Sequence, residues 1–475
     1  MLSKKSYRVA LLSLLFLPCL PALRAGDTAL DRYVHKPDAT YSWKLVQEKK
    51  GNPVTKYVLD LKSQAWRSEA DVDRQVWQHW LTIIKPEKAT SNIAFLFISG
   101  GKNSDKPVEK ADPLMVKIAE ATNGIVAELK MVPNEPLVFH KDGVGRVEDD
   151  LIAYTWDQYL KTGDDTWPAR LPMTKSAVRA MDAVQEFLAS GQGGHYKVDK
   201  FVVSGGSKRG WTTWCTAAVD ERVVAIVPFV IDVLNVPTSM RHHVEAYGFY
   251  AEAVGDYMKH NIMQRSSDPK LKDLYAIEDP YSYRDRLTMP KFVVNSAGDQ
   301  FFCPDSSQFY YGDLKGEKYL RYVPNTDHSL KDSDALESAI AFYWTVLAGK
   351  PRPKYSWTFE PDGSIRVTTP DHPKRVVLWT AENPAARDFR LESIGKAYKS
   401  TELTDIGSGA YVFAAKPHVP AKGWSASFIE LTFDVGGPTP LKLTSAVRVL
   451  PDRLPFAGVD PAKAPYEGPK EHKNK

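Results

Sequence analysis

The sequence predicts an α/β protein in which a mostly parallel, eight-stranded sheet with helices on both faces carries a cap insertion and is followed by a C-terminal β-sandwich. Three observations lead to this fold class. Strand-length apolar runs alternate with helical segments over the first 350 residues. The later runs are apolar at nearly every position, as in strands covered on both faces. Beyond residue 355 only strand-like runs remain, and turn signals separate them.

The strands of the first domain, residues 26–350, are expected in two groups. The first two alternate apolar and polar residues and resemble an antiparallel edge hairpin, whereas the later ones are more continuously apolar. The eight ranges are Val54–Leu61, Val76–Ile84, Asn92–Ile98, Gly124–Glu128, Phe201–Val203, Val223–Val230, Lys291–Asn295 and Lys318–Val323. Helices are expected between them, among them Asp149–Lys161 and Thr174–Leu188, and the second begins at the capping residue Thr174.

The alternating pattern breaks at about residues 232–290, where we expect the cap insertion. Arg241–Lys259 is rich in His, Tyr, Glu and Met and is predicted to be helical. This segment either covers the site as a lid or packs on the core as a surface helix pair, and the sequence leaves both open.

A linker at Lys350–Lys354 precedes the expected β-sandwich, residues 355–450. Turn signals such as Pro361-Asp362-Gly363 separate its strands. The strand-like runs are Tyr355–Phe359, Ser364–Thr369, Arg375–Thr380, Ala410–Ala415, Ser425–Phe433 and Leu441–Val449. The final segment, residues 451–475, is rich in Pro and Lys, and we expect it to be loose beyond Pro455.

Residues 1–25 are typical of a secretory signal peptide. Basic residues precede the apolar run Val9–Leu17, and small residues lead to a cleavage point after Ala25. The run is too short to span a bilayer comfortably, and Cys19 lacks the small preceding residue of a lipoprotein signal. We therefore expect a periplasmic or secreted protein that keeps no stable membrane anchor after cleavage.

Cleavage also changes the charge and the cysteine content of the chain. The segment carries four basic residues and no acidic one, so its loss lowers the formal net charge from +4 to 0. A neutral chain gives no reason to expect nucleic-acid binding. Cys215 and Cys303 remain, and they either form a disulfide or stay apart, with Cys215 a small core residue.

The most informative motif lies between Phe201 and Gly210. An apolar, β-branched run stops at Gly205-Gly206, and Ser207 follows directly, which is the pattern of a sharp strand-to-helix turn called a nucleophile elbow. Residues without side chains are needed beside the serine because the backbone folds tightly there. Arg209 departs from the common pattern, which has a small residue at that place. The motif predicts a nucleophilic Ser207, and the alternative is a Gly-rich turn without chemistry.

A nucleophilic serine needs a general base and an acid that orients it, and in the hydrolase order the acid comes next and the histidine last. Asp299 follows the run Lys291–Asn295, and His328 follows Lys318–Val323. Ser207, Asp299 and His328 thus lie at the ends of three predicted strands, where open α/β sheets place their sites. Asp232, which ends the strand after the elbow, is the alternative acid.

An oxyanion hole would complete this site. Its first backbone amide is expected from Lys208, directly after the serine, and its second from Gly101 or Lys102 in the turn after the third strand. An ordinary Gly-Gly turn is the alternative interpretation. The side chains of Lys208 and Arg209 could attract an anionic substrate, but internal pairing with Glu148, Asp149 or Asp150 is the safer expectation.

Other residues are candidates for contact with a substrate, and none suggests a cofactor. The tentative substrate-binding residues are Arg209, Glu148, Asp149, Trp211 and Tyr247. His242-His243 lacks the helical spacing of a metal site, and the sequence has no phosphate loop or dinucleotide fingerprint. We therefore expect neither a metal nor a cofactor.

Several segments strongly resemble the PhoPQ-activated pathogenicity-related protein family. They are Pro133–Leu137, Glu148–Trp156, Arg170–Lys175, Gly205–Gly210, Gly298–Phe302 and Asn383–Arg390. The resemblance runs from about Asp31 to about Val449 and implies an α/β-hydrolase fold with a C-terminal β-domain in an exported bacterial protein. It does not imply a defined substrate. The elbow alone also resembles that of glucuronoyl esterases, which place a cationic residue after the serine and a glycine three places beyond it. A distant likeness to dipeptidyl and prolyl peptidases concerns the fold only.

These observations predict an exported serine hydrolase that cleaves an ester or an amide by acyl transfer. Its substrate would be a small molecule, a glycan ester or a peptide. One alternative is a peptidase that removes short N-terminal units and holds the substrate amine with Glu148, Asp149 and Asp150. The other is a stress-response or binding protein on a hydrolase scaffold, without catalysis.

Overall fold

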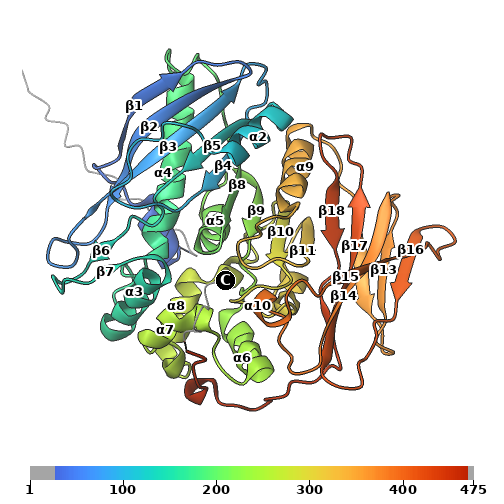
Figure 1. Cartoon of the computed structure of the whole chain (residues 1–475). Coiled ribbons are helices and arrows are strands. Elements are labelled where there is room, and N and C mark those ends of the chain that lie inside the picture. Colours follow the sequence, from blue (N-terminus) through green and yellow to red (C-terminus); the bar gives the residue numbers. More distant parts are fainter. Residues whose placement is uncertain (1–26, 469–475) are drawn as a thin grey trace, which may run out of the picture.

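The computed structural model describes residues 27–468, and its centre is a nine-stranded sheet with the order β1-β2-β3-β5-β4-β8-β9-β10-β11 (Figure 1). Its strands are β1 (Ser42–Lys49), β2 (Val54–Ala65), β3 (Val76–Pro86), β4 (Ile93–Ile98), β5 (Ile125–Leu129), β8 (Lys200–Gly206), β9 (Val223–Phe229), β10 (Lys291–Ser296) and β11 (Lys318–Val323). The strands from β5 to β11 in this order are parallel, whereas β1, β2 and β3 are antiparallel. The predicted α/β-hydrolase fold is thereby confirmed.

The sheet has one strand more than the eight expected from the sequence. The additional strand is β1, which pairs with β2 at the edge of the sheet. None of its side chains is fully buried, since exposed and half-buried residues alternate along it. An edge strand needs little apolar sequence, so its hydrophobic signal was too weak to identify it.

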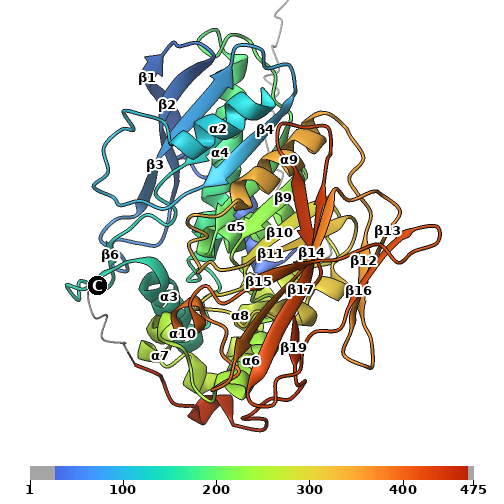
Figure 2. The ribbon, with the colours of Figure 1, turned by 45° about the vertical axis from the view of Figure 1, so that its right-hand side comes forward.

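Helices cover both faces of the sheet, as expected. The helices outside the cap are α1 (Ala29–His35), α2 (Pro113–Thr122), α3 (Glu148–Thr162), α4 (Arg170–Ala189), α5 (Lys208–Val219), α9 (Ala335–Leu347) and α10 (Leu391–Ile394). α2 and α9 lie side by side on one face (Figure 2), and α1, α4 and α5 pack on the other. A two-stranded hairpin, β6 (Leu137–Val138) and β7 (Gly145–Arg146), precedes α3.

The chain between β9 and β10 forms several short helices, and the segment Arg241–Lys259, which was predicted to be helical, is helical only in part. They are α6 (Val236–Tyr247), α7 (Gly255–Lys259) and α8 (Pro269–Glu278), with 3-10 turns at Glu252–Val254, Met263–Arg265 and Pro280–Tyr283. α6 ends at Gly248, whose φ of 82° lies in the left-handed region that glycine adopts easily. The helical segment is therefore interrupted after Tyr247 and resumes as an α-helix at Gly255.

The C-terminal part consists of two antiparallel sheets that pack on the β11 and α9 side of the first domain. β12 (Ser356–Phe359), β13 (Ile365–Thr369) and β16 (Tyr411–Ala415) form the first sheet. β14 (Arg375–Asn383), β15 (Lys399–Glu402), β17 (Trp424–Phe433), β18 (Leu441–Thr444) and β19 (Arg448–Leu450) form the second. One buried cluster joins α2, α9 and the inner faces of both sheets, so this region shares a core with the first domain.

The chain after Pro455 is not loose where the structure describes it. Tyr250 in the cap donates its backbone N–H to the oxygen of Pro465 at 2.8 Å, and it accepts a bond from the amide of Glu467 at 2.9 Å. The Glu467 carboxylate lies 2.7 Å from Arg390. In Figure 1 this segment runs beneath α6, α7 and α8, and we call residues 455–468 the C-terminal strap. The prediction of a loose segment failed because its partners lie more than 70 residues away in the sequence.

The expected signal peptide, residues 1–25, lies outside the described residues. Between residues 27 and 468, no helix has the length and apolar character needed to cross a bilayer. Cys215 and Cys303 are both buried and are not joined by a disulfide.

Candidate active site

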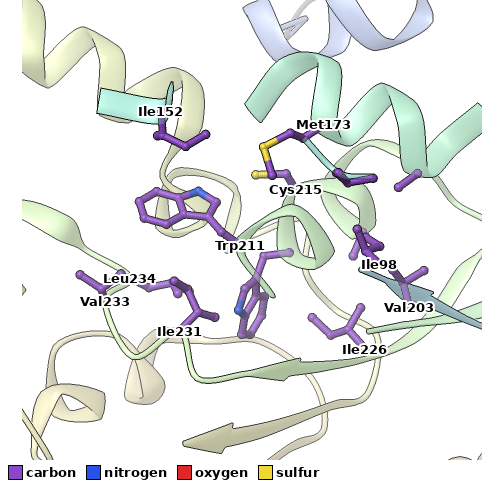
Figure 3. Packing of buried hydrophobic residues seen from close by; sticks show 14 of the residues in the cluster. Ile98, Ile152, Met173, Val203, Trp211, Cys215, Ile226, Ile231, Val233 and Leu234 are labelled. Atoms are coloured by element: carbon purple, nitrogen blue, oxygen red, sulfur yellow. The ribbon is translucent and has the colours of Figure 1, made fainter. Parts of the chain in front are cut away.

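Ser207 lies in the sharp turn between β8 and α5. Its φ of 55° and ψ of −126° are strained for a residue with a side chain, as a nucleophile elbow requires. The Ser207 amide donates to the oxygen of Phe229 at 3.0 Å. Behind the turn, Trp211 and Cys215 of α5 are buried near residues of the sheet (Figure 3). The turn is thus held from both its strand and its helix.

The two glycines before Ser207 have different roles. A Cβ atom on Gly205 would lie 2.7 Å from the oxygen and 2.8 Å from the carbonyl carbon of Arg209, which are backbone atoms of α5. A Cβ atom on Gly206 would meet nothing within 4 Å. The close approach of strand and helix therefore depends on the first glycine.

Gly205→Ala is expected to lower the free energy of unfolding by about 1–3 kcal/mol, because the added methyl group overlaps backbone that cannot move freely. The matched variant Gly206→Ala should change it by less than about 0.5 kcal/mol. Urea unfolding of both variants and the parent checks this. Equal midpoints for the two variants would contradict the role given to Gly205.

Asp299 and His328 meet at the ends of β10 and β11. The Nδ1 atom of His328 lies 2.7 Å from Oδ2 of Asp299, whose Oδ1 accepts the amide of Phe301 at 2.8 Å. The backbone of His328 donates to the side chain of Gln300 at 2.8 Å, and the Phe301 ring lies 4.4 Å from the imidazole. A carboxylate on Nδ1 favours the tautomer with its proton there, which leaves a lone pair on Nε2.

The other ring nitrogen of His328, Nε2, takes no part in the hydrogen bond to Asp299. It is buried and has no hydrogen-bond partner among residues 27–468. Ser207 and His328 line the same pocket of about 730 Å³, although no hydrogen bond joins the two side chains in this arrangement. His328 thus keeps an unsatisfied lone pair and lines the same pocket as the serine.

Asp232, the alternative acid, has other partners. Tyr310 donates to one of its oxygens at 2.6 Å and Tyr322 to the other at 2.5 Å. Burial raises the pKa of Asp232 to about 8, and the nearby charge of Asp299 acts in the same direction. Asp299, not Asp232, therefore holds the histidine in this structure.

The turn after β4 lies beside the elbow, because Ile98 pairs with Gly205. The amide of Lys102 donates to Oδ2 of Asp105 at 2.9 Å, so it is already engaged. Gly101 has a φ of 141°, which only glycine adopts without strain. Of the two candidates in this turn, Gly101 is therefore the better source of the second oxyanion-hole amide. The first would be the amide of Lys208, at the start of α5.

The cations beside the serine pair internally, as the sequence led us to expect. Lys208 Nζ lies 2.6 Å from Glu148 and 3.0 Å from Asp149. Arg209 binds Glu148 with two hydrogen bonds of 2.9 and 2.7 Å and donates to the oxygen of Val132 at 2.6 Å. Burial alone would raise the pKa of Glu148, but these two cations hold it well below its usual range. The cluster fixes the start of α3 against the start of α5.

The two aromatic candidates lie in different places. Trp211 lines a small pocket of about 50 Å³ that also contains Ser207, Lys208 and Asp149. Tyr247 is buried with Cys303, under the guanidinium of Arg390, and lines neither pocket at Ser207. Its assignment as a substrate contact has no support from this position.

A buried ion pair beside the small pocket was not found from the sequence. Arg170 and Glu278 lie 3.1 Å apart, and the guanidinium lies 3.7 Å from the centre of the Trp211 ring. Glu278 also accepts from the indole of Trp156 at 2.5 Å. The Arg170–Lys175 segment belongs to the resemblance stated above, but a single glutamate at the end of a cap helix carries no local signal.

One cluster of potential metal ligands lies within the described residues, and the sequence spacing did not indicate it. His242, Cys303 and Asp305 offer ligand atoms within 4.8 Å of one another. Asp305 already lies 2.9 Å from the imidazole of His242 and 2.6 Å from the guanidinium of Arg387. The carboxylate of Asp305 is thus already engaged by two side chains of the protein.

Residues 30–390 match the family model of the PhoPQ-activated pathogenicity-related proteins. The chain is also 38% identical over 471 residues to autocrine proliferation repressor protein A of Dictyostelium discoideum, with 93% of this chain and 94% of that protein covered.

Solved structures resemble the chain more weakly. Acetyl xylan esterase 1 from a Thermoanaerobacterium species matches with a TM-score of 0.46 and 14% identity, over 67% of this chain and 92% of that one. A glucuronoyl esterase from Solibacter usitatus matches with a TM-score of 0.39 and 12% identity, over 66% and 90%. At these scores the likeness carries no information about the reaction or the substrate.

Proposed function

Because the chain belongs to the PhoPQ-activated pathogenicity-related protein family and has an α/β-hydrolase fold with a serine at a strained elbow, we propose that it is an exported serine hydrolase that cleaves esters. The observation that carries the proposal is the pair formed by His328 and Asp299. The Nε2 atom of His328 is buried and has no partner among residues 27–468, and His328 lines the same pocket as Ser207.

The reaction would proceed through an acyl-enzyme. The Ser207 oxygen attacks the carbonyl carbon of the ester while Nε2 of His328 takes the hydroxyl proton. Asp299 holds the imidazole in the required tautomer and stabilises the positive charge that forms on it. The amides of Lys208 and Gly101 would bind the oxygen that becomes negative.

The remaining steps release the two products. When the tetrahedral intermediate collapses, the carbon–oxygen bond breaks and His328 gives its proton to the leaving alcohol. Water then attacks the acyl-enzyme, His328 takes a proton from the water, and this proton returns to Ser207 as the carboxylic acid leaves. The distance between the side chains of Ser207 and His328 must shorten when substrate binds. Catalytic hydrogen bonds are often long in sites without ligand and tighten in the complex with substrate.

The peptidase alternative fits the structure less well. It needs a carboxylate that can bind a substrate amine, and Glu148, Asp149 and Asp150 were the candidates. Each already has partners: the first two bind Lys208, and Asp150 binds Lys259 at 2.8 Å and His260 at 2.7 Å. A substrate amine would have to displace an ion pair that the protein forms by itself.

A fluorophosphonate probe tests the proposal, since it reacts with serines that an adjacent base activates. We expect one labelled site in the folded protein, located by peptide mass spectrometry at Ser207, and no labelling after heat denaturation. A folded protein that resists the probe would instead favour a binding protein on a hydrolase scaffold.

A further inference from the structure

Two pockets meet at Ser207, and they differ in size and surroundings. The larger one, about 730 Å³, contains both Ser207 and His328 and lies along α2 and α9. The smaller one, about 50 Å³, lies under the cap and contains Ser207 but not His328. The lining of the small pocket is mainly apolar and aromatic, with Trp156, Trp211, Phe301 and Phe302 among its residues.

The position of the histidine decides which half of an ester each pocket would take. In the proposed reaction His328 must reach the leaving oxygen to protonate it, so the leaving group has to lie on the side of His328. The larger pocket is therefore the leaving-group side. The acyl group must extend in the other direction, into the small pocket.

The small pocket restricts both the length and the charge of an acyl group. A water-sized group needs about 10–15 Å³ of such space, so a pocket of about 50 Å³ holds about three to five such groups, which is the size of a short acyl chain. The charged residues of its lining are already paired: Lys208 with Asp149 at 3.0 Å, and Arg170 with Glu278 at 3.1 Å. An uncharged acyl group leaves these pairs intact.

Behind the small pocket lies a further cavity of about 890 Å³, between the cap and the C-terminal strap. Met240, Met263 and Tyr275 line both spaces and therefore form the wall between them. The two methionines are 8% and 7% exposed, so little of either side chain reaches solvent. Because the methionine side chain is long and unbranched, replacing either methionine with alanine would remove its part of this wall.

We propose that the protein selects esters of short, uncharged acids with bulky alcohols, and that Met240 and Met263 set the limit on acyl length by closing the small pocket at its far end. This inference rests on the proposed function of Ser207. It adds a specificity that the serine, the histidine and the acid do not determine.

The test measures kcat/KM for p-nitrophenyl esters of two-, four-, six- and eight-carbon acids. The parent should hydrolyse the two- and four-carbon esters with a kcat/KM about 10-fold or more above that for the eight-carbon ester. A single methylene group that does not fit a hydrophobic pocket already lowers kcat/KM by about 10-fold. In Met240→Ala and Met263→Ala, the ratio of eight-carbon to two-carbon activity should rise by about 10-fold or more, because the pocket then opens into the larger cavity.

Met181→Ala is the matched control. Met181 is a fully buried methionine on α4 that lines none of these spaces, so its loss loosens the core without changing the acyl pocket, and the chain-length ratio should stay at the parent value. If both cap variants fail to fold, the parent profile alone decides. A parent that hydrolyses long and short esters equally, or cap variants that fold and keep the parent ratio, would overturn the inference while the hydrolase function stands. A parent that hydrolyses no ester and resists the fluorophosphonate would overturn both.

Discussion

Ser207→Ala is expected to lower kcat/KM for activated esters by about 10⁴- to 10⁶-fold and to abolish labelling by a fluorophosphonate. The substitution removes the nucleophile but keeps the Cβ atom, so the strain at a φ of 55° is the same in both proteins. Stability should therefore change by less than about 1 kcal/mol. Initial rates on p-nitrophenyl acetate, together with a thermal unfolding curve, check both statements.

Ser204→Ala is the matched control for this variant. Ser204 lies on the same strand, three residues before the elbow, and its hydroxyl donates to the oxygen of Val227 at 2.6 Å. Its loss removes one buried hydrogen bond, which costs about 1 kcal/mol, but no reacting group. Activity that survives in Ser207→Ala, or that disappears equally in both variants, would show that Ser207 is not the nucleophile.

Asp299→Asn is expected to lower kcat/KM by about 10⁴-fold, because an amide on Nδ1 of His328 favours the wrong tautomer and cannot stabilise the imidazolium. The hydrogen bond of 2.7 Å between these residues is the basis of this expectation. Asp232→Asn should lower it by less than about 10-fold, since Asp232 receives its bonds from Tyr310 and Tyr322 instead. Steady-state kinetics of the two variants decide between the acids. The opposite order of effects would assign the role to Asp232.

Asp232→Asn should also change how stability depends on pH. With a pKa raised by burial to about 8, against an ordinary value of 3.8, Asp232 keeps its proton in the folded protein and loses it on unfolding. Its contribution to stability is therefore greatest below pH 3.8 and declines as the pH rises toward 8. Asp232→Asn should remove this decline, so that its unfolding free energy falls less than that of the parent between these pH values.

The order of strands and the positions of the candidate residues could be predicted from short windows of sequence. Eight of the nine strands in the central sheet were found, because buried strands are apolar runs bounded by turn residues. Asp299 and His328 were identified by the same logic, since a polar residue that directly follows a parallel strand lies at one edge of the sheet. The edge strand β1 was not predicted, because its side chains are at most half-buried and its sequence is therefore not an apolar run.

Other features depend on contacts between distant parts of the chain. Lys208 and Arg209 reach carboxylates about 60 residues earlier, and the C-terminal strap packs on a cap more than 200 residues before it. Only the folded chain shows that Asp299 meets the histidine while Asp232 meets two tyrosines. Both aspartates follow strands, but β10, which precedes Asp299, pairs with β11, which precedes His328, whereas β9, which precedes Asp232, does not adjoin β11.

The sequence by itself thus determined the fold class, the elbow and the candidate residues at the strand ends, because hydrophobic period and turn chemistry act within a few residues. The tertiary structure decided which acid holds the histidine, which cations are already paired, and where Met240 and Met263 divide the space beside Ser207. These depend on the packing of segments that are far apart along the chain, and no local pattern encodes the distance between them.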